Sequence, residues 1–279
     1  MATGVRPRRL AGEGAHVLRT LDDALALRDR LTPGSRLAVV GAGFLGAEAA
    51  AVARRLGARV TLLEPAPVPL AHAVGTEVGR VLSRAHLDHG VELRTGVTVT
   101  EVTEDGVRLA DGELVDADEI LVAIGSLPNT EWLADSGLAV GDGVVCDQYC
   151  EVAEGVYAAG DVARWHNPLF GVSMRIEHRT NAAEQGMAAA RNLLAGREAR
   201  KPFAPMPYFC HDEVAVVEGD LAERRFVAAY GTGERLTGVL AVGMPPKAVR
   251  AWRQAIAGGS TWDEAVPAGT PAAGATKVA

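Results

Sequence analysis

Residues 36–64 read RLAVVGAGFLGAEAAAVARRLGARVTLLE. The first five have the length and the apolar character of a buried strand. A helix is predicted over 47–56, and a second buried strand over 59–63 closes on Glu64. Between the first strand and the helix lies a Gly-x-Gly-x-x-Gly turn, which consists of Gly41, Gly43 and Gly46. This order of elements predicts a βαβ unit and hence a parallel sheet.

The glycine turn and Glu64 have the pattern of a dinucleotide site. The first glycine allows the tight turn, the second lets the backbone approach a pyrophosphate, and the third lets the helix pack on the strand. The helix N-terminus offers unpaired N–H groups to the phosphates. Glu64 is placed for the ribose hydroxyls of adenosine, and no Arg or Lys in 65–71 would attract a 2′-phosphate. NAD(H) is therefore favoured over NADP(H); the alternative is a glycine turn in an α/β protein without cofactor.

Composition excludes several classes of protein. The 279 residues are 48% hydrophobic and 23% charged, which suits one large or two smaller domains with a substantial core. A net charge of −7 gives no electrostatic reason to bind nucleic acid or an anionic membrane. No apolar run has the length of a membrane span, no signal peptide is recognised, and three cysteines do not build a disulfide framework. We expect a cytoplasmic protein.

The rest of the chain alternates short strands with helices. A capped helix is predicted to start at Thr20, an Ala-rich helix over 180–194, and a strand over 155–161 that ends in Gly160-Asp161. The other predicted elements are a helix over 76–89, strands over 91–94, 97–102, 107–109 and 120–124, and a C-terminal group with strands at 213–217, 225–230 and 236–242 and a helix at 247–257.

With these residues in view, the chain resembles flavoprotein reductases with two dinucleotide domains, of the ferredoxin (putidaredoxin) reductase type. The resemblance covers roughly residues 2–257, and its motifs stand in the family's order. They are Ala2-Thr3-Gly4, Leu18-Arg19-Thr20-Leu21-Asp22-Asp23, the glycine turn with Glu48, Val122-Ala123-Ile124-Gly125 with Pro128-Asn129, Gly155 to Asp161, Glu177-His178 with Thr180-Asn181-Ala182, and Pro207-Tyr208-Phe209.

The resemblance implies a domain plan. The fold is α/β, with a Rossmann-like NAD domain (20–125) inserted in a partial FAD domain (1–19 and 126–202). A small α+β C-terminal domain (203–262) of the kind that forms the family's interfaces follows. The tail (263–279) is expected to be disordered because its Ala, Pro, Gly and Thr residues have little to pack.

The resemblance also implies a reaction. NADH would pass a hydride to FAD, and the reduced flavin would pass single electrons to an iron–sulfur ferredoxin that serves an oxygenase. The residues implied to bind the cofactors are Gly41, Gly43, Gly46, Glu48, Glu64, Gly125, Gly160, Asp161 and His178; no catalytic residue and no metal site are predicted. Asp161 could instead cap a helix, Glu48 could be a surface residue of the first helical turn, and His178 could be a helix-start residue.

The chain departs from the family pattern in several places. It starts after the family's FAD-binding βαβ segment, which we interpret as a truncated reading frame, a decayed gene, or a segment supplied by a second chain. Arg179 and Cys210 stand where aromatic residues are usual, Val68 and His72 where basic ones are common, and the segment between Asp212 and Glu213 looks shortened. The alternative function is therefore a non-catalytic NAD(H)-binding module or half-enzyme.

Two other chemistries are disfavoured. A disulfide reductase needs a redox-active pair such as Cys-x-x-Cys, whereas Cys146 and Cys150 have three residues between them and are interpreted as ordinary residues. His86 and His89 lie at a helix end without a nearby cluster of further ligands, and a helix-end position near the negative dipole end explains them better than a metal does.

Overall fold

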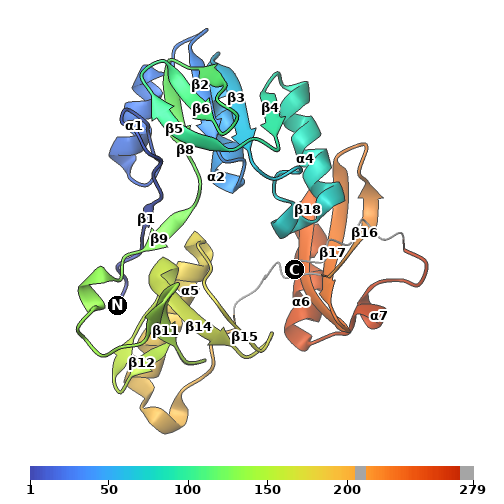
Figure 1. Ribbon diagram of the computed structural model, residues 1–279. Coiled ribbons are helices and arrows are strands. Elements are labelled where there is room, and N and C mark those ends of the chain that lie inside the picture. The colour runs from blue at the N-terminus through green and yellow to red at the C-terminus, as the bar shows by residue number, and fades with distance from the viewer. Residues whose placement is uncertain (205–211, 271–279) are drawn as a thin grey trace. The chain divides into compact units, whose positions relative to one another are not determined.

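The computed structural model describes residues 1–204 and 212–270. These residues form two units, which are described separately: unit 1 contains residues 1–6 and 126–204, and unit 2 contains residues 7–125 and 212–270. Helices and parallel strands occur together, which confirms the α/β class (Figure 1).

Unit 2 is built on a parallel sheet. Its strand order is β4 (Glu92–Thr95), β3 (Arg59–Glu64), β2 (Arg36–Val40) and β8 (Glu119–Val122), and all three pairings are parallel. The βαβ unit predicted from the glycine turn is confirmed, since α2 (Phe44–Arg55) joins β2 to β3.

The two faces of this sheet are covered differently because side chains alternate along a strand. Leu37 and Val39 pack against α1 (Leu21–Arg30) and α2 through Leu27, Ala50 and Ala53. Ala38 and Val40 pack on the other face, against a three-stranded antiparallel sheet of β5 (Val99–Thr103), β6 (Gly106–Leu109) and β7 (Leu114–Asp116). The alternation of side chains along β2 thus places helices against one face of the sheet and a second, antiparallel sheet against the other (Figure 1).

Capping fixes the start of α1, as predicted. The Thr20 hydroxyl accepts the Asp23 N–H at 3.1 Å, and the Asp23 carboxylate accepts the Thr20 N–H at 2.8 Å. The N–H that Thr20 donates to the Asp23 carboxylate also lowers the pKa of Asp23, because it favours the charged form.

The C-terminal strands also belong to unit 2. The antiparallel strands β16 (Glu213–Asp220), β17 (Arg225–Thr232) and β18 (Arg235–Val242) pack on α3 (Ala71–Val74) and α4 (Thr76–Asp88). The fully buried Tyr230 donates its hydroxyl to the carbonyl of Val74 at 3.0 Å. The sheet is followed by η4 (Pro246–Val249), α6 (Arg250–Gly258) and α7 (Trp262–Ala265). Helix α7 includes the first residues of the tail that was predicted to be disordered over 263–279. Residues 271–279 lie outside the described residues.

Unit 1 has a smaller, mixed sheet. Its order is β10 (Val140–Gly141), β11 (Gly143–Cys146), β14 (Ala163–Asn167) and β15 (Val172–Met174), and β11 and β14 are parallel. Trp165 on β14 is fully buried, and its ring lies 5.4 Å from that of Phe203. The remaining elements are β12 (Glu151–Ala153), β13 (Val156–Tyr157), the 3₁₀ turns η1 (Glu131–Leu133), η2 (Gly160–Val162) and η3 (Arg197–Ala199), α5 (Arg179–Ala195), and the pair β1 (Val5–Pro7) and β9 (Ser126–Pro128).

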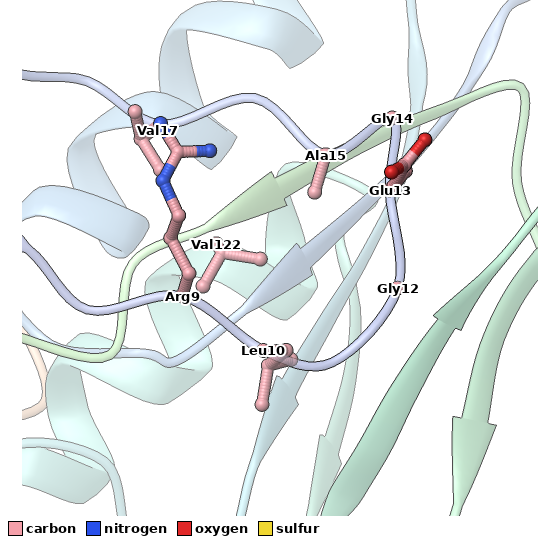
Figure 2. Close-up of a pocket in the computed structure, with 8 residues that line it drawn as sticks. All are labelled: Arg9, Leu10, Gly12, Glu13, Gly14, Ala15, Val17 and Val122. Carbon is pink, nitrogen blue, oxygen red and sulfur yellow. The ribbon is translucent and has the colours of Figure 1, made fainter.

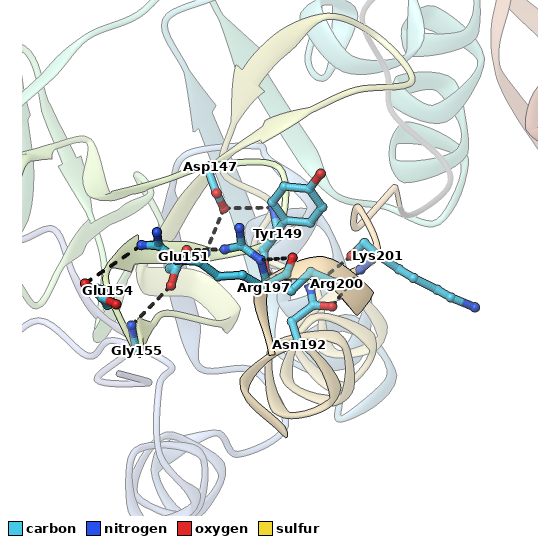
Figure 3. A network of polar contacts seen from close by, with 9 residues as sticks. All are labelled: Asp147, Tyr149, Glu151, Glu154, Gly155, Asn192, Arg197, Arg200 and Lys201. Carbon is cyan, nitrogen blue, oxygen red and sulfur yellow. Dashed lines mark hydrogen bonds and ion pairs between the residues drawn. The ribbon is translucent and has the colours of Figure 1, made fainter. Parts of the chain in front are cut away.

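A polar network holds the β12–β13 hairpin against the end of α5 (Figure 3). Arg200 forms an ion pair with Glu151, and its guanidinium lies 4.6 Å from the ring centroid of Tyr149. The buried Asn192 donates to the carbonyls of Tyr149 and Lys201, both at 2.9 Å. These contacts anchor the segment that leads into Gly160-Asp161.

Within the described part of the chain, no helix combines the length and the apolar character needed to cross a bilayer.

Candidate functional site

The glycine turn of unit 2 has little room for side chains at two of its three glycines. Gly41 has φ of +99°, and a Cβ there would lie 2.5 Å from the carbonyl oxygen of Ala123. A Cβ on Gly46 would lie 1.9 Å from the carbonyl oxygen of Gly41. Both residues are therefore required by the fold itself, as the sequence pattern predicts.

Gly43 is different. It is the N-cap of α2, with φ of −68°, and a Cβ on it would meet no atom within 4 Å. A side chain would therefore fit the fold but would occupy the open space above the turn. The first turn of α2 has no side-chain cap and no acidic residue, so its N–H groups and partial positive charge are available to an anion. A cradle of this kind fits a pyrophosphate.

Glu64 lies beside this turn at the end of β3. One carboxylate oxygen accepts the Ala42 N–H at 2.8 Å, and the other accepts the Ala66 N–H at 3.0 Å. The side chain is half-buried and held in one place by these bonds. A carboxylate has about four lone-pair sites, so acceptor capacity remains for ribose hydroxyls. The structure therefore brings Glu64 and the glycine turn together.

Glu48 and Gly125 are also in unit 2. Because α2 begins at Phe44 and not at Ala47, Glu48 lies one turn further into the helix than expected, and it is exposed. This corrects the expected first-turn position of Glu48. Gly125 is exposed with φ of +91°, and its carbonyl accepts the Arg8 N–H at 2.9 Å.

The other three predicted residues lie in unit 1. Gly160 is buried with φ of +77°, and its N–H donates to Oε1 of the buried Gln185 at 2.8 Å. Asp161 is in η2, which leads directly into β14. Asp161 is not followed directly by a long helix, because α5 starts only after the β14–β15 hairpin. Asp161 consequently does not cap a long helix.

His178 is the N-cap of α5. Its Nδ1 accepts the Thr180 N–H at 3.1 Å. One turn into this helix, Asn181 is 5% exposed and its Oδ1 has no partner among the described residues. A buried acceptor without a donor at the start of a 17-residue helix fits a ligand that supplies a hydroxyl or an N–H. A flavin carries donors of both kinds, so this orphan acceptor is compatible with a bound flavin.

A separate pocket of about 200 Å³ lies in unit 2 between the 9–17 connection and β8 (Figure 2). Arg9, Glu13 and Val122 are among its lining residues. None of the nine predicted cofactor residues lines it, so it does not coincide with the glycine turn.

The chemistries disfavoured from the sequence gain no support. Cys146 and Cys150 are buried free cysteines, and burial raises the pKa of each thiol to about 12. Neither is a thiolate near neutral pH, which a redox cysteine pair requires. Cys210 lies outside the described residues. Over the residues that the structure describes, no group of three potential ligands for a metal ion is found.

Sequence reasoning missed one charged residue of unit 1. Arg175 contacts the backbone of Asp161 and the side chain of Glu177. In the sequence, its role is indicated only by its position, two residues before Glu177 and between the apolar residues Met174 and Ile176.

Comparison with known proteins agrees with this geometry. The sequence profile of the pyridine nucleotide-disulphide oxidoreductases matches residues 1–186. The chain belongs to this family. It is 41% identical over 235 residues to the ferredoxin–NAD(+) reductase component of the p-cumate 2,3-dioxygenase system of Pseudomonas putida, covering 81% of this chain and 57% of that relative. The chain thus spans little more than half of that relative's length.

Solved structures show the same relationship. The crystal structure of Fdr9 superposes with a TM-score of 0.85 at 38% identity, covering 95% of this chain and 72% of that one. The crystal structure of the covalent putidaredoxin reductase–putidaredoxin complex superposes with a TM-score of 0.82 at 31% identity, covering 91% and 68%. These matches confirm the two-dinucleotide-domain fold expected from the resemblance.

Proposed function

We propose that the chain acts as an NADH-dependent flavoprotein oxidoreductase that passes electrons through FAD to an iron–sulfur ferredoxin serving an oxygenase. The observation that carries this proposal is the pairing of Glu64 with the Ala42 N–H beside the open space at Gly43. The names of the relatives, a ferredoxin–NAD(+) reductase component of a dioxygenase system among them, support the choice of acceptor. The cytoplasm, where NADH is available, is the compartment this activity favours.

NADH would be held in unit 2. The N–H groups at the start of α2 would bind its pyrophosphate, and Gly43 would allow the close approach. Glu64 would accept the adenosine ribose hydroxyls while its bonds to Ala42 and Ala66 keep the carboxylate in place. The same fixed charge disfavours a 2′-phosphate, because moving the carboxylate away would break two hydrogen bonds.

FAD would be held by unit 1, through Gly160, Asp161 and the start of α5 with His178. When bound, FAD supplies the conversion of a two-electron hydride transfer into single-electron steps. The chain's own contribution is to orient the cofactors. A further FAD-binding segment on a second chain is the alternative source of any flavin contacts that this chain does not make.

The test is a steady-state assay with the full purified chain, FAD, NADH and an iron–sulfur ferredoxin, followed by the absorbance of the ferredoxin. Reduction of the ferredoxin that requires both FAD and NADH supports the proposal. NADPH at the same concentration serves as the control and should give a much lower rate. A chain that binds NADH but neither binds FAD nor reduces the ferredoxin would contradict the proposal and would leave the alternative, a non-catalytic NAD(H)-binding module.

A further inference from the structure

Arg175 of unit 1 is a charged residue with little access to water. It follows β15 directly, and its side chain is 11% exposed. Its Nη1 donates to the carbonyl oxygen of Asp161 at 3.1 Å and to Oε1 of Glu177 at 2.5 Å. Its Nε donates to Oδ1 of Asp142 at 3.1 Å. One guanidinium therefore joins its own segment to two earlier ones, which lie 33 and 14 residues away at Asp142 and Asp161.

The acceptor on Glu177 is shared. The hydroxyl of Ser126 donates to the same Oε1 that Arg175 contacts. Ser126 is the first residue of β9 and of the long second segment of unit 1. The cluster consequently links the start of this segment to the Gly160-Asp161 turn and to the residue before His178.

Packing keeps the guanidinium in this position. A Cβ on Gly143 would lie 2.6 Å from the carbonyl oxygen of Val162 and 3.1 Å from Cδ of Arg175. Gly143, the first residue of β11, has φ of +105° and lies beside the arginine stem. A side chain at position 143 would therefore collide with the carbonyl oxygen of Val162 and crowd the arginine stem.

These contacts act on the backbone of Asp161 and not only on side chains. A carbonyl held by a guanidinium fixes the peptide that carries the Asp161 carboxylate. Asp142 and Glu177 form ion pairs with the arginine, so that its charge is compensated at low exposure. We propose that Arg175 is a positioning residue that holds the Gly160-Asp161 turn in the conformation that receives the flavin.

The proposal has two parts: Arg175 orders the Gly160-Asp161 turn, and the ordered turn binds FAD. The second part rests on the proposed function. The first part can be tested on the chain without a cofactor. The two parts can be measured separately, and an arginine that merely stabilises unit 1 would alter the overall unfolding transition without a local effect on the turn.

The experiment uses the full chain with Arg175→Gln, Arg175→Lys and Arg175→Ala, and with Arg164→Gln as the matched control. Arg164 also faces Asp142, at 3.7 Å, but its side chain is 38% exposed. Amide hydrogen exchange of residues 158–164 is followed without flavin. FAD affinity is measured by the quenching of flavin fluorescence. For chemical rescue, free guanidinium is added to the Arg175→Ala protein at a concentration that leaves the wild type folded.

We expect Arg175→Gln to speed exchange in 158–164 while the protection of α5 is retained, and to weaken FAD binding roughly tenfold or more. Guanidinium should restore both properties to Arg175→Ala in part, and Arg164→Gln should behave like the wild type. Unchanged exchange in the turn, or equal FAD affinity of wild type and Arg175→Gln, would overturn the inference. If the wild type binds no FAD, the proposed function fails, and the exchange data still decide whether Arg175 orders the turn.

Discussion

The carboxylate of Glu64 accepts the amide N–H of Ala42 at 2.8 Å, so the acidic end of β3 is bonded to the glycine turn at the end of β2. The two features that a dinucleotide needs, an anion cradle and a ribose acceptor, are thus one connected structure before any ligand arrives. Pre-organisation of this kind reduces the cost of ordering a site on binding.

Replacing Glu64 should change the choice of dinucleotide. In Glu64→Ser the ribose acceptor and the repulsive charge are both lost. We expect NADH affinity to fall by about tenfold, equivalent to about 1.4 kcal/mol, and the preference for NADH over NADPH to shrink. Titration of both nucleotides, followed by their fluorescence, measures the two affinities. A variant with unaltered preference would show that Glu64 does not contact the ribose.

The glycines of the turn should separate fold from binding. Gly46→Ala places a Cβ against the Gly41 carbonyl, so we expect a loss of about 3 kcal/mol in the free energy of unfolding. Gly43→Ala meets no neighbouring atom and should cost less than about 1 kcal/mol, yet it fills the cradle and should weaken NADH binding about tenfold or more. Urea unfolding and NADH titration of the two variants distinguish the roles. Equal NADH affinity in wild type and Gly43→Ala would argue against a pyrophosphate at this turn.

Tyr230 provides a test of how the C-terminal strands are attached within unit 2. In Tyr230→Phe the buried carbonyl of Val74 loses its donor. Leaving a buried acceptor unpaired costs about 1–3 kcal/mol, so the urea midpoint should fall accordingly. A variant as stable as the wild type would mean that another donor takes over the Val74 carbonyl.

His86 should make stability depend on pH. Burial, and then the nearby His89, lower the pKa of His86 in the folded chain. The folded state therefore favours the neutral ring: its contribution is complete above the unfolded pKa of about 6.5 and is lost as the pH falls toward the lower folded pKa. Urea unfolding at about pH 7.5 and about pH 5, on either side of the unfolded pKa, measures this effect. The free energy of unfolding should fall less between these two pH values in His86→Gln than in the wild type. His72→Gln, at an exposed position, is the control and should follow the wild type.

The buried cysteines should be unreactive in the folded protein. Because burial raises the pKa of Cys146 and Cys150 to about 12, the reactive thiolate form is scarce near neutral pH. Alkylation followed by peptide mass spectrometry should label both residues only after denaturation. Rapid labelling of either one in the native protein, or a disulfide between them, would reopen the disulfide reductase interpretation.

Much of unit 2 could be predicted from local sequence. β2 has the bounds expected for it, and the Thr20 capping box starts α1, because strand length, glycine turns and caps are local signals. The short helix α3 could not be predicted, since it follows Leu70 in a left-handed conformation (φ of +60°) that tertiary packing imposes on a leucine.

The candidate site was predictable only where its residues share one motif. Gly41, Gly46 and Glu64 belong to a single βαβ unit, and the structure brings them together. Arg175 could not be found in this way, because its partners Asp142 and Asp161 reach it through sheet pairing that no local pattern specifies. The start of α2 also differs from the prediction, because Phe44 to Gly46 are helical in the structure, where Gly41 and Gly46 lie close to Ala123.

The most direct test of the proposed function is the anaerobic addition of NADH to the full chain loaded with FAD, followed by the visible absorbance of the flavin. We predict that NADH bleaches the flavin, that NADPH at the same concentration does so far more slowly, and that Gly43→Ala suppresses the bleaching by NADH. Flavin that stays oxidised in the presence of bound NADH would contradict the proposed electron transfer.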